Sequence, residues 1–386
     1  MHLIESYATT CGLQIDKPFV YEKFFPLGFE KYITLSASHE QAKFYDYWND
    51  VIDIISPTLK SKNIEIVQLG NKECKAIPKC ASANGLTNRN QEAYIIRNSL
   101  LHMGVDDYLS QLAGFYDKKT VCIYSNNYPS DIKPYWGSSS NQILMESHRD
   151  EKKPSFSAVE NPKTINLINP EDIAKNVLEL LSFEFSYPFK TLSSGGNYFN
   201  KIIETIPNQV VDVKSMGVST IIYRMDFEFN EENLAQQLSL CKCSIVTNKP
   251  ISEELIKKYK PQINEIVYFI DENHDPSFAS VLQKNGIKYA LMTLLPEEDV
   301  RKYKIHYIDY GIIFPRTLPD IEKYKGKSNL FYKSSKLTLS NGKMFISKSA
   351  MLKDQPVKDQ NDIQNVFDEE EFWDEADYFC ILEKTS

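Results

Sequence analysis

The sequence predicts an α/β protein built from two domains. Its 386 residues are about twice the length of an average domain. Short apolar runs alternate with longer segments in which apolar residues recur at helical spacing, and this alternation restarts in the second half of the chain. A strand–helix–strand rhythm of this kind is typical of a parallel sheet with helices on both faces.

In the first half, strands and helices follow one another without interruption. Strands are expected at residues 32–35, 64–69, around 103 and at 120–124, and helices at 45–59, 91–101, 108–115 and 170–181. Pro170 suits the first turn of the last helix, because an N–H at that position would have no partner inside the helix. We therefore assign residues 1–186 to a first domain.

The segment 187–200 contains Pro188 and the small-residue run 193–196, which together predict a linker. Beyond it, strands are expected at 210–213, 220–223, 243–246, 265–270 and 289–293, and helices at 231–240, 252–259 and 277–285. These elements define a second α/β domain over residues 201–320.

Residues 321–386 form a C-terminal extension in this prediction. Two alternating runs over 336–347 flank Asn341-Gly342. Asn-Gly between such runs is a strong β-hairpin signal, because both turn residues must adopt positive φ. A further strand is expected at 378–382.

The net charge of −8 conceals an uneven distribution. Residues 323–353 hold eight lysines and no acid, whereas residues 354–386 hold eleven acids and two lysines. The overall acidity argues against a protein that coats nucleic acid, but lysines interleaved with aromatics suit phosphate contact and base stacking. The same lysines could instead neutralise the acidic tail or protect an exposed edge strand.

The seven cysteines are odd in number and form no Cys-x-x-Cys pair, and the six histidines are scattered singly. This pattern predicts reduced thiols and no metal site. No window approaches 18 consecutive apolar residues, and the N-terminus lacks a basic segment. We therefore expect no membrane span and a cytoplasmic protein, in the host cytoplasm if the chain is viral.

The most informative stretch runs from residue 99 to residue 124. It predicts a strand, a tight turn at Gly104–Asp107, a helix that begins near Tyr108, and another strand. The turn would lie at the carboxyl edge of a parallel sheet, where α/β folds bind ligands, and the helix N-terminus could receive a diphosphate. Alternatively, Asp106 or Asp107 merely caps the helix.

Gly104 and Asp106, followed by Leu112-Ala113, match part of a Gly-x-Asp-Ser/Thr-Gly-x-x-His-x-Ala pattern. The segment thereby resembles the nucleotide-sugar domain of the heptosyltransferases related to the lipopolysaccharide ADP-heptose enzymes. Asp107, Tyr108 and Gln111 stand where that pattern has Ser/Thr, Gly and His. These departures concern the contacts to the phosphates.

Other pieces of the same family follow in order over residues 1–182. His2 and Gly12 bound a segment that resembles the hinge helix, and the strand end at Ser36 with the following Lys43 resembles the first strand of the donor domain. Gly70 and Glu73 resemble the strand end that reaches the nucleotide ribose. The resemblance covers just under half of the chain.

The resemblance implies a GT-B type glycosyltransferase with two Rossmann-like domains. In the family an acceptor-binding domain precedes the hinge helix, whereas this chain starts at the hinge, so the implied domain order is rearranged. The implied reaction is an inverting single displacement from a nucleotide sugar, such as a UDP- or ADP-sugar, to an acceptor hydroxyl, with no obligatory metal or cofactor. The implied donor-binding residues are Ser36, Lys43, Gly70, Lys72, Glu73, Thr87, Gly104, Asp106, Asp107, Tyr108 and Gln111.

The candidate catalytic base lies in the second domain. Asp226 and Glu228 follow a predicted strand and precede a predicted helix, where the family has its catalytic Asp after its own first strand. Both acids could instead be solvated loop residues or helix caps. On the acceptor side, Tyr135 and Trp136 could stack on a base or sugar, or plug the edge of the core.

Two other functions compete with transfer to a glycan. The first is a viral DNA glycosyltransferase that acts on hydroxymethylated pyrimidines and holds DNA with Lys333, Lys336 and Lys343. The second is a non-catalytic binding protein that retains a degenerate nucleotide-sugar fold. The Gln at the family's His position favours this second alternative.

Overall fold

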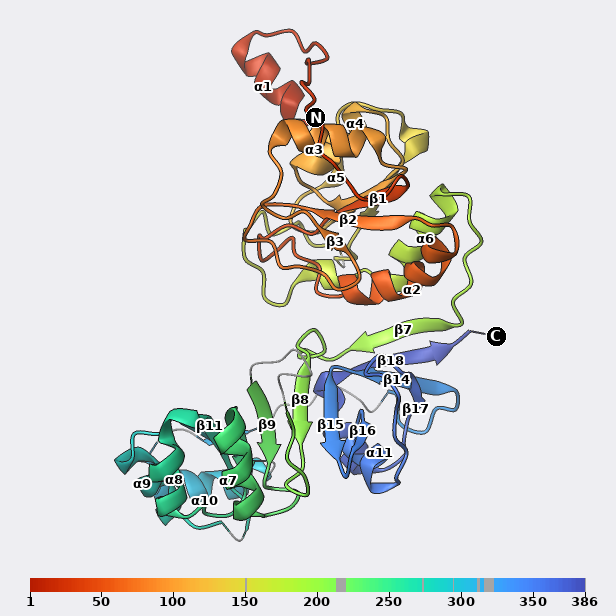
Figure 1. The fold of residues 1–386 in the computed structure, drawn as a ribbon. Coiled ribbons are helices and arrows are strands. Elements are labelled where there is room, and N and C mark those ends of the chain that lie inside the picture. Colours follow the sequence, from red (N-terminus) through yellow and green to blue (C-terminus); the bar gives the residue numbers. More distant parts are fainter. Residues whose placement is uncertain are drawn as a thin grey trace. The chain divides into compact units, whose positions relative to one another are not determined.

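The computed structural model describes residues 1–149, 151–212, 220–272, 274–293, 295–310, 313–315 and 323–385. The chain divides into two compact units, Met1–Pro188 and Phe189–Ser386 (Figure 1). The expected boundary between residues 320 and 321 lies outside the described residues. Within the described part of the chain, every helix is too short or too polar to cross a lipid bilayer.

The first unit is built on a six-stranded sheet with the order β3-β2-β1-β4-β5-β6, in which every neighbouring pair is parallel. Its strands are β1 Tyr32–Ser36, β2 Glu65–Leu69, β3 Ala81–Ser82, β4 His102–Val105, β5 Thr120–Tyr124 and β6 Gln142–Glu146. Its helices are α1 Leu3–Cys11, α2 Trp48–Ser61, α3 Arg89–Asn98, α4 Tyr108–Phe115, α5 Pro129–Ile132 and α6 Pro170–Leu180. Strands β1 and β5 are buried along their whole length, as expected for a parallel sheet covered on both faces.

The helices of this unit form two layers, one on each face of the sheet. Figure 1 shows α3 and α4 on one face and α2 and α6 on the other. The chain leaves β1 through α2 toward β2 and leaves β4 through α4 toward β5, so it winds outward from the middle of the sheet in both directions. Right-handed crossovers then place the helices of the two halves on opposite faces.

The second unit contains an eight-stranded sheet with the order β13-β12-β11-β10-β9-β8-β15-β16, and a four-stranded antiparallel sheet with the order β17-β14-β18-β7. Its strands are β7 Phe189–Ser194, β8 Ile202–Thr205, β9 Thr220–Arg224, β10 Lys242–Thr247, β11 Ile263–Phe269, β12 Tyr289–Thr293, β13 Ile313–Pro315, β14 Leu330–Ser334, β15 Lys336–Ser340, β16 Lys343–Phe345, β17 Gln364–Asn365 and β18 Phe379–Lys384. Its helices are α7 Glu231–Leu240, α8 Glu253–Tyr259, α9 Ser277–Lys284, α10 Glu297–His306, α11 Lys348–Leu352 and α12 Glu370–Trp373. One hydrophobic core joins residues of both sheets.

The prediction of a linker at residues 187–200 is wrong, because this segment contains strand β7. This strand pairs with β18, whose residues lie almost two hundred positions later in the chain, so no local pattern announces the pairing. At Gly195 two backbone segments approach closely, and a Cβ there would lie 2.3 Å from the backbone oxygen of Asp377. The position therefore requires a residue without a side chain.

The C-terminal segment is an integral part of the second unit rather than an appended extension. Strand β15 lies parallel to β8 inside the large sheet, and β16 pairs with it in antiparallel fashion through the turn at Asn341-Gly342. Both turn residues have positive φ, at 48° and 73°.

The strand expected at 210–213 is wrong over its described residues, 210–212, and residue 213 lies outside them. The neighbouring strand is β8, at Ile202–Thr205. The side-chain amide of Gln237 accepts from the Val211 N–H at 2.8 Å and donates to the Val211 carbonyl at 3.0 Å. This amide satisfies the backbone groups that a sheet ladder would otherwise use.

Candidate functional site

The carboxyl ends of β1 and β4 form the topological switch point of the first sheet, where ligands of open α/β sheets bind. Ser36, the last residue of β1, is paired in register with Gly104 of β4. A Cβ on Gly104 would lie 2.1 Å from Ser36 Oγ and 2.9 Å from the Ser36 carbonyl oxygen. Only glycine therefore allows the Ser36 hydroxyl to lie against the β4 backbone.

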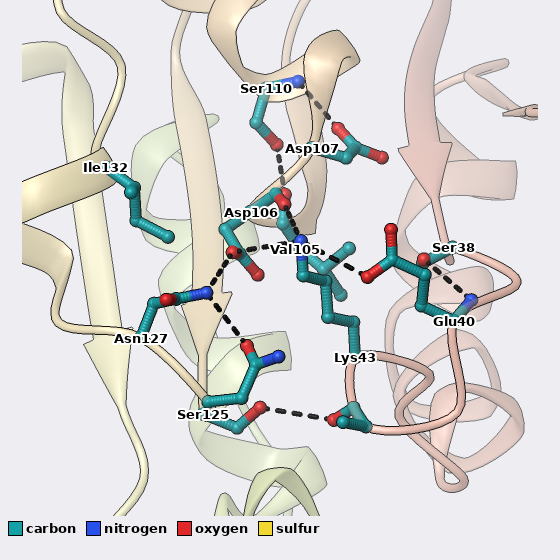
Figure 2. A network of polar contacts seen from close by, with 12 residues as sticks. Ser38, Glu40, Lys43, Val105, Asp106, Asp107, Ser110, Ser125, Asn127 and Ile132 are labelled. Atoms are coloured by element: carbon teal, nitrogen blue, oxygen red, sulfur yellow. Dashed lines mark hydrogen bonds and ion pairs between the residues drawn. The ribbon is translucent and has the colours of Figure 1, made fainter. Parts of the chain in front are cut away.

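Lys43 reaches this edge from the segment after β1, and Figure 2 shows its ammonium group between Asp106 and Glu40. Its Nζ donates to the Asp106 carbonyl at 3.1 Å and lies 3.3 Å from Asp106 Oδ2 and 3.5 Å from Glu40 Oε2. Burial acts to lower the pKa of Lys43, but the two carboxylates outweigh it and the pKa is raised. Lys43 is therefore a fixed positive charge at the sheet edge.

Asp106 is the buried acid of the site, with a side chain only 4% exposed. Its Oδ2 contacts Lys43 and accepts from Asn127 Nδ2 at 3.4 Å, whereas its Oδ1 is buried and has no hydrogen-bond partner among the residues that the structure describes. Burial raises the pKa of Asp106 to about 6, although Lys43 opposes the change. A buried carboxylate with one unsatisfied oxygen has unused capacity to accept a hydrogen bond.

Asp107 is the N-cap of α4, and Figure 2 shows it facing the start of that helix. Its Oδ1 accepts from the Ser110 N–H at 3.0 Å. Burial raises the pKa of the Asp107 carboxyl, and the hydrogen bonds from Ser110, Ser36 and Leu109 oppose the change. The carboxyl group occupies the position at the helix N-terminus where a diphosphate was expected, so the capping alternative describes Asp107.

Buried polar side chains around His102 hold the site residues in position. His102 Nδ1 lies 3.0 Å from Thr34 Oγ1, and its Nε2 lies 3.3 Å from Ser36 Oγ and 3.2 Å from Ser110 Oγ. Burial lowers the pKa of His102 to about 3, so the imidazole is neutral at physiological pH. His102 thus holds the Ser36 hydroxyl and the start of α4 in place.

Gly70 and Glu73, which the resemblance relates to the nucleotide ribose, lie with Lys72 at the neighbouring strand end after β2, and Thr87 follows β3. The turn after β2 requires glycine at position 70, because a Cβ there would lie 2.6 Å from Cys74 Sγ. Lys72 and Glu73 are exposed, and Thr87 Oγ1 donates to Glu92 Oε1 at 3.3 Å. Since β2 lies beside β1 in the sheet, these residues form a rim on the same carboxyl edge.

Four other expected site residues line a cavity of this unit, with a volume of about 380 Å³. They are Tyr108, Gln111, Tyr135 and Trp136, and His2 also lines the cavity. The Gln111 amide donates to the Ile132 carbonyl at 2.7 Å and accepts from the Tyr135 N–H at 3.3 Å. The Gln111 amide thus positions the loop around α5, and donor binding by this residue stays a prediction.

In the second unit, the two candidate catalytic acids have different environments. Asp226 lies in the turn after β9 and accepts from Arg224 Nε at 2.8 Å and from Arg224 Nη2 at 2.7 Å. It lines a cavity of about 350 Å³. Glu228 is exposed and does not line that cavity, so the geometry favours Asp226 over Glu228.

The expected DNA-binding lysines do not form a common surface. Lys336 is only 4% exposed, and its Nζ lies 2.6 Å from Glu375 Oε1 and 3.0 Å from Glu204 Oε2. Burial acts to lower the pKa of Lys336, but the two carboxylates outweigh it and the pKa is raised. Lys333 is also buried, whereas Lys343 is 46% exposed and pairs with Asp354 at 2.7 Å. The nucleic-acid role expected for Lys336 and Lys333 is wrong, because both residues are buried.

Sequence patterns did not identify the residues that complete the switch-point site, namely Glu40, His102 and Asn127. His102 stands two positions before Gly104 in a buried strand, and a polar residue there is the one signal that could have drawn attention to it. Among the residues that the structure describes, no group of three or more His, Cys, Asp or Glu side chains is arranged to hold a metal ion.

Comparisons with known proteins give matches to solved structures alone. No family model matches the chain, and no curated protein matches it. A glycosyl transferase family 9 structure from Veillonella parvula has 14% identity and a TM-score of 0.32, over 46% of this chain and 50% of that one. The ADP-heptose lipopolysaccharide heptosyltransferase II of E. coli has 14% identity and a TM-score of 0.31, over 46% and 51%.

The E. coli heptosyltransferase TibC, solved in complex with ADP-D-beta-D-heptose, has 11% identity and a TM-score of 0.35, over 44% of this chain and 51% of that one. The chain thus spans about half the length of the structures that it matches. These structures are glycosyltransferases, the class of protein that the sequence motifs resemble. At these TM-scores the matches leave the function to be argued from the residues of the site.

Proposed function

We propose that this protein is a glycosyltransferase that takes a nucleotide sugar at the carboxyl edge of its first sheet and transfers the sugar to an acceptor hydroxyl. The observation that carries the proposal is the arrangement at the switch point between β1 and β4. There a half-buried lysine and a buried carboxylate with an unsatisfied oxygen lie side by side, beside the close contact of Ser36 and Gly104.

Each of these groups has a task in such a reaction. The ammonium of Lys43 stabilises the negative charge of the diphosphate as it leaves. Asp106 Oδ1 accepts a hydrogen bond from a hydroxyl of the donor, which supplies the partner that this oxygen lacks. The donor is a nucleotide sugar such as a UDP- or ADP-sugar.

The transfer itself is an inverting single displacement in this proposal. The acceptor oxygen attacks the anomeric carbon while the bond from that carbon to the phosphate oxygen breaks, and the electron pair leaves with the nucleoside diphosphate. A carboxylate of the second unit takes the proton of the acceptor hydroxyl, and Asp226 is the candidate for this role. The second unit is the acceptor side in this proposal.

A non-catalytic binding protein is the second candidate, and a specific observation favours it. The N-terminus of α4 is capped by Asp107, and Gln111 is engaged with the loop around α5. A donor diphosphate would have to bind beside a carboxyl group.

A thermal-shift screen of UDP-, ADP-, GDP- and CMP-sugars tests the proposal. We expect one nucleotide class to raise the melting temperature, and Asp106→Ala to remove the effect. Slow hydrolysis of the same nucleotide sugar then separates an enzyme from a binding protein. An equal response to all four classes, or no response, would contradict a donor site at the switch point.

A further inference from the structure

The cavity of the second unit lies at the carboxyl ends of β9, β10, β11 and β12, and its volume is about 350 Å³. Its lining includes Arg224, Asp226, Asn248, Phe269, Asp271 and Lys336. The carboxyl edge of a parallel sheet is where α/β folds place ligands, and the volume falls in the usual range of small-molecule sites.

Arg224 and Lys336 are the two most buried cations of the cavity lining. Both are paired with carboxylates that lie in the lining or behind it. Arg224 makes two hydrogen bonds to Asp226 and a third, of 2.8 Å, to Glu204. Lys336 lies between Glu204 and Glu375. Neither cation is therefore available as an unmatched charge for an anionic ligand.

The lining also has more acids than bases. It holds five carboxylates and three basic side chains, so a phosphate or carboxylate ligand would meet an excess of like charge. A purely apolar ligand is equally disfavoured, because it would cover carboxylate and amide groups without supplying hydrogen bonds. A neutral ligand with several hydroxyl groups satisfies both conditions.

The apolar part of the lining fits the same class of ligand. Phe269, Leu295 and Pro296 lie beside the polar groups, and Phe269 does not belong to the hydrophobic core of the unit. The Phe227 ring is already covered by the Arg224 guanidinium at 3.9 Å. Phe269 is thus the aromatic surface offered to a ligand, and a pyranose presents C–H groups on its faces and hydroxyls around its rim.

We propose that this cavity binds the sugar ring of a neutral glycan, with Phe269 against one face of the ring and Asp226, Asn248 and Asp271 bonded to its hydroxyls. This inference rests on the proposed function in one respect, since it identifies the acceptor of that reaction as a carbohydrate. The binding itself requires no nucleotide.

Saturation-transfer NMR on the full chain, without nucleotide, tests the cavity directly. The probes are the methyl glycosides of glucose, galactose, mannose and N-acetylglucosamine, with inorganic pyrophosphate as an anionic probe. We expect a saturable signal for at least one glycoside, unaffected by pyrophosphate. Phe269→Ala and Asp271→Asn should each weaken its affinity at least fivefold.

Two matched variants make the result specific. Phe229→Ala removes an aromatic ring of the same unit that does not line the cavity, and Lys175→Ala removes an exposed lysine of the first unit. Both should bind the glycoside as the wild type does. Absence of binding by every glycoside, competition by pyrophosphate, or equal losses in Phe229→Ala and Phe269→Ala would overturn the inference. Since no nucleotide is present, a failure of the donor site would leave this measurement unchanged.

Discussion

The carboxyl edges of the two large sheets differ in how their buried charged groups are paired. At the edge of the first sheet, Asp106 keeps one oxygen without a partner although Lys43 lies 3.3 Å from the other. At the edge of the second sheet, Arg224 and Lys336 are matched by three carboxylates, those of Asp226, Glu204 and Glu375. The first edge has unused hydrogen-bonding capacity, whereas the second has a closed ionic network beneath an open cavity.

An unpartnered buried group is typical of a ligand-binding site, whereas a matched ionic network is typical of a structural support. A buried group with no partner is costly in the free protein, so a ligand that supplies the partner binds there with a gain. A matched network gives little to a charged ligand but holds the surrounding walls in fixed positions. The unsatisfied oxygen at the first edge therefore suits a hydroxyl of a ligand, and the matched network at the second edge suits a ligand without charge.

The largest expected effect is on the matched network. Lys336→Met removes the cation that pairs with the buried carboxylates of Glu375 and Glu204, of which Glu204 keeps its pair with Arg224. We expect a loss of about 3 to 5 kcal/mol in the free energy of unfolding. Lys343→Ala is the control, because its exposed pair with Asp354 should contribute less than about 1 kcal/mol. Urea unfolding of both variants is the measurement, and equal losses would contradict the distinction between a buried network and a surface pair.

The next effect concerns the pH dependence of the first edge. The pKa of Asp106 is raised from 3.8 to about 6 in the folded state, so the folded protein holds this proton more tightly than the unfolded chain does. The resulting stability is present below about pH 4 and is lost as the pH rises through about 6, by about 2 to 3 kcal/mol in all. Asp106→Asn should remove this slope in unfolding measurements from pH 4 to 7, and an unchanged slope would assign it to another group.

A smaller effect is expected at the contact between β1 and β4. Gly104→Ala places a methyl group against Ser36, and we expect a cost of about 1 to 3 kcal/mol with loss of nucleotide-sugar binding. Gly28→Ala is a matched control, since a Cβ there meets no atom within 4 Å. Thermal unfolding and a binding titration of both variants give the comparison, and it fails if Gly104→Ala behaves as Gly28→Ala does.

Local patterns predicted the elements whose boundaries depend on nearby residues. The helix expected at 108–115 is observed at Tyr108–Phe115, because Asp107 caps it and its apolar face follows from spacing alone. Strand β5 is observed at Thr120–Tyr124, as expected from its continuous apolar run. Gly104 and Asp106 could likewise be placed at the sheet edge from their position between a strand and a helix.

Features that depend on distant residues could not be predicted in this way. Lys336 can be buried because it pairs with Glu204 and Glu375, which are far from it in the sequence. The lysine-rich segment alone therefore predicts a basic surface that the folded chain does not have at this residue. The pairing of β7 with β18 has the same origin. In the site, Asn127 and Glu40 come from separate loops and reach Asp106 and Lys43 only in the folded chain.

The most direct test of the central claim is a calorimetric titration of the nucleotide sugar that gives the largest thermal shift. Lys43→Ala should weaken binding by about 10- to 100-fold, the range expected for loss of a charged hydrogen bond of about 1.5 to 3 kcal/mol. Lys175→Ala removes an equivalent lysine from the exposed surface of α6 and should bind as the wild type does. Equal affinities for all three proteins would contradict a donor site at the switch point of the first sheet.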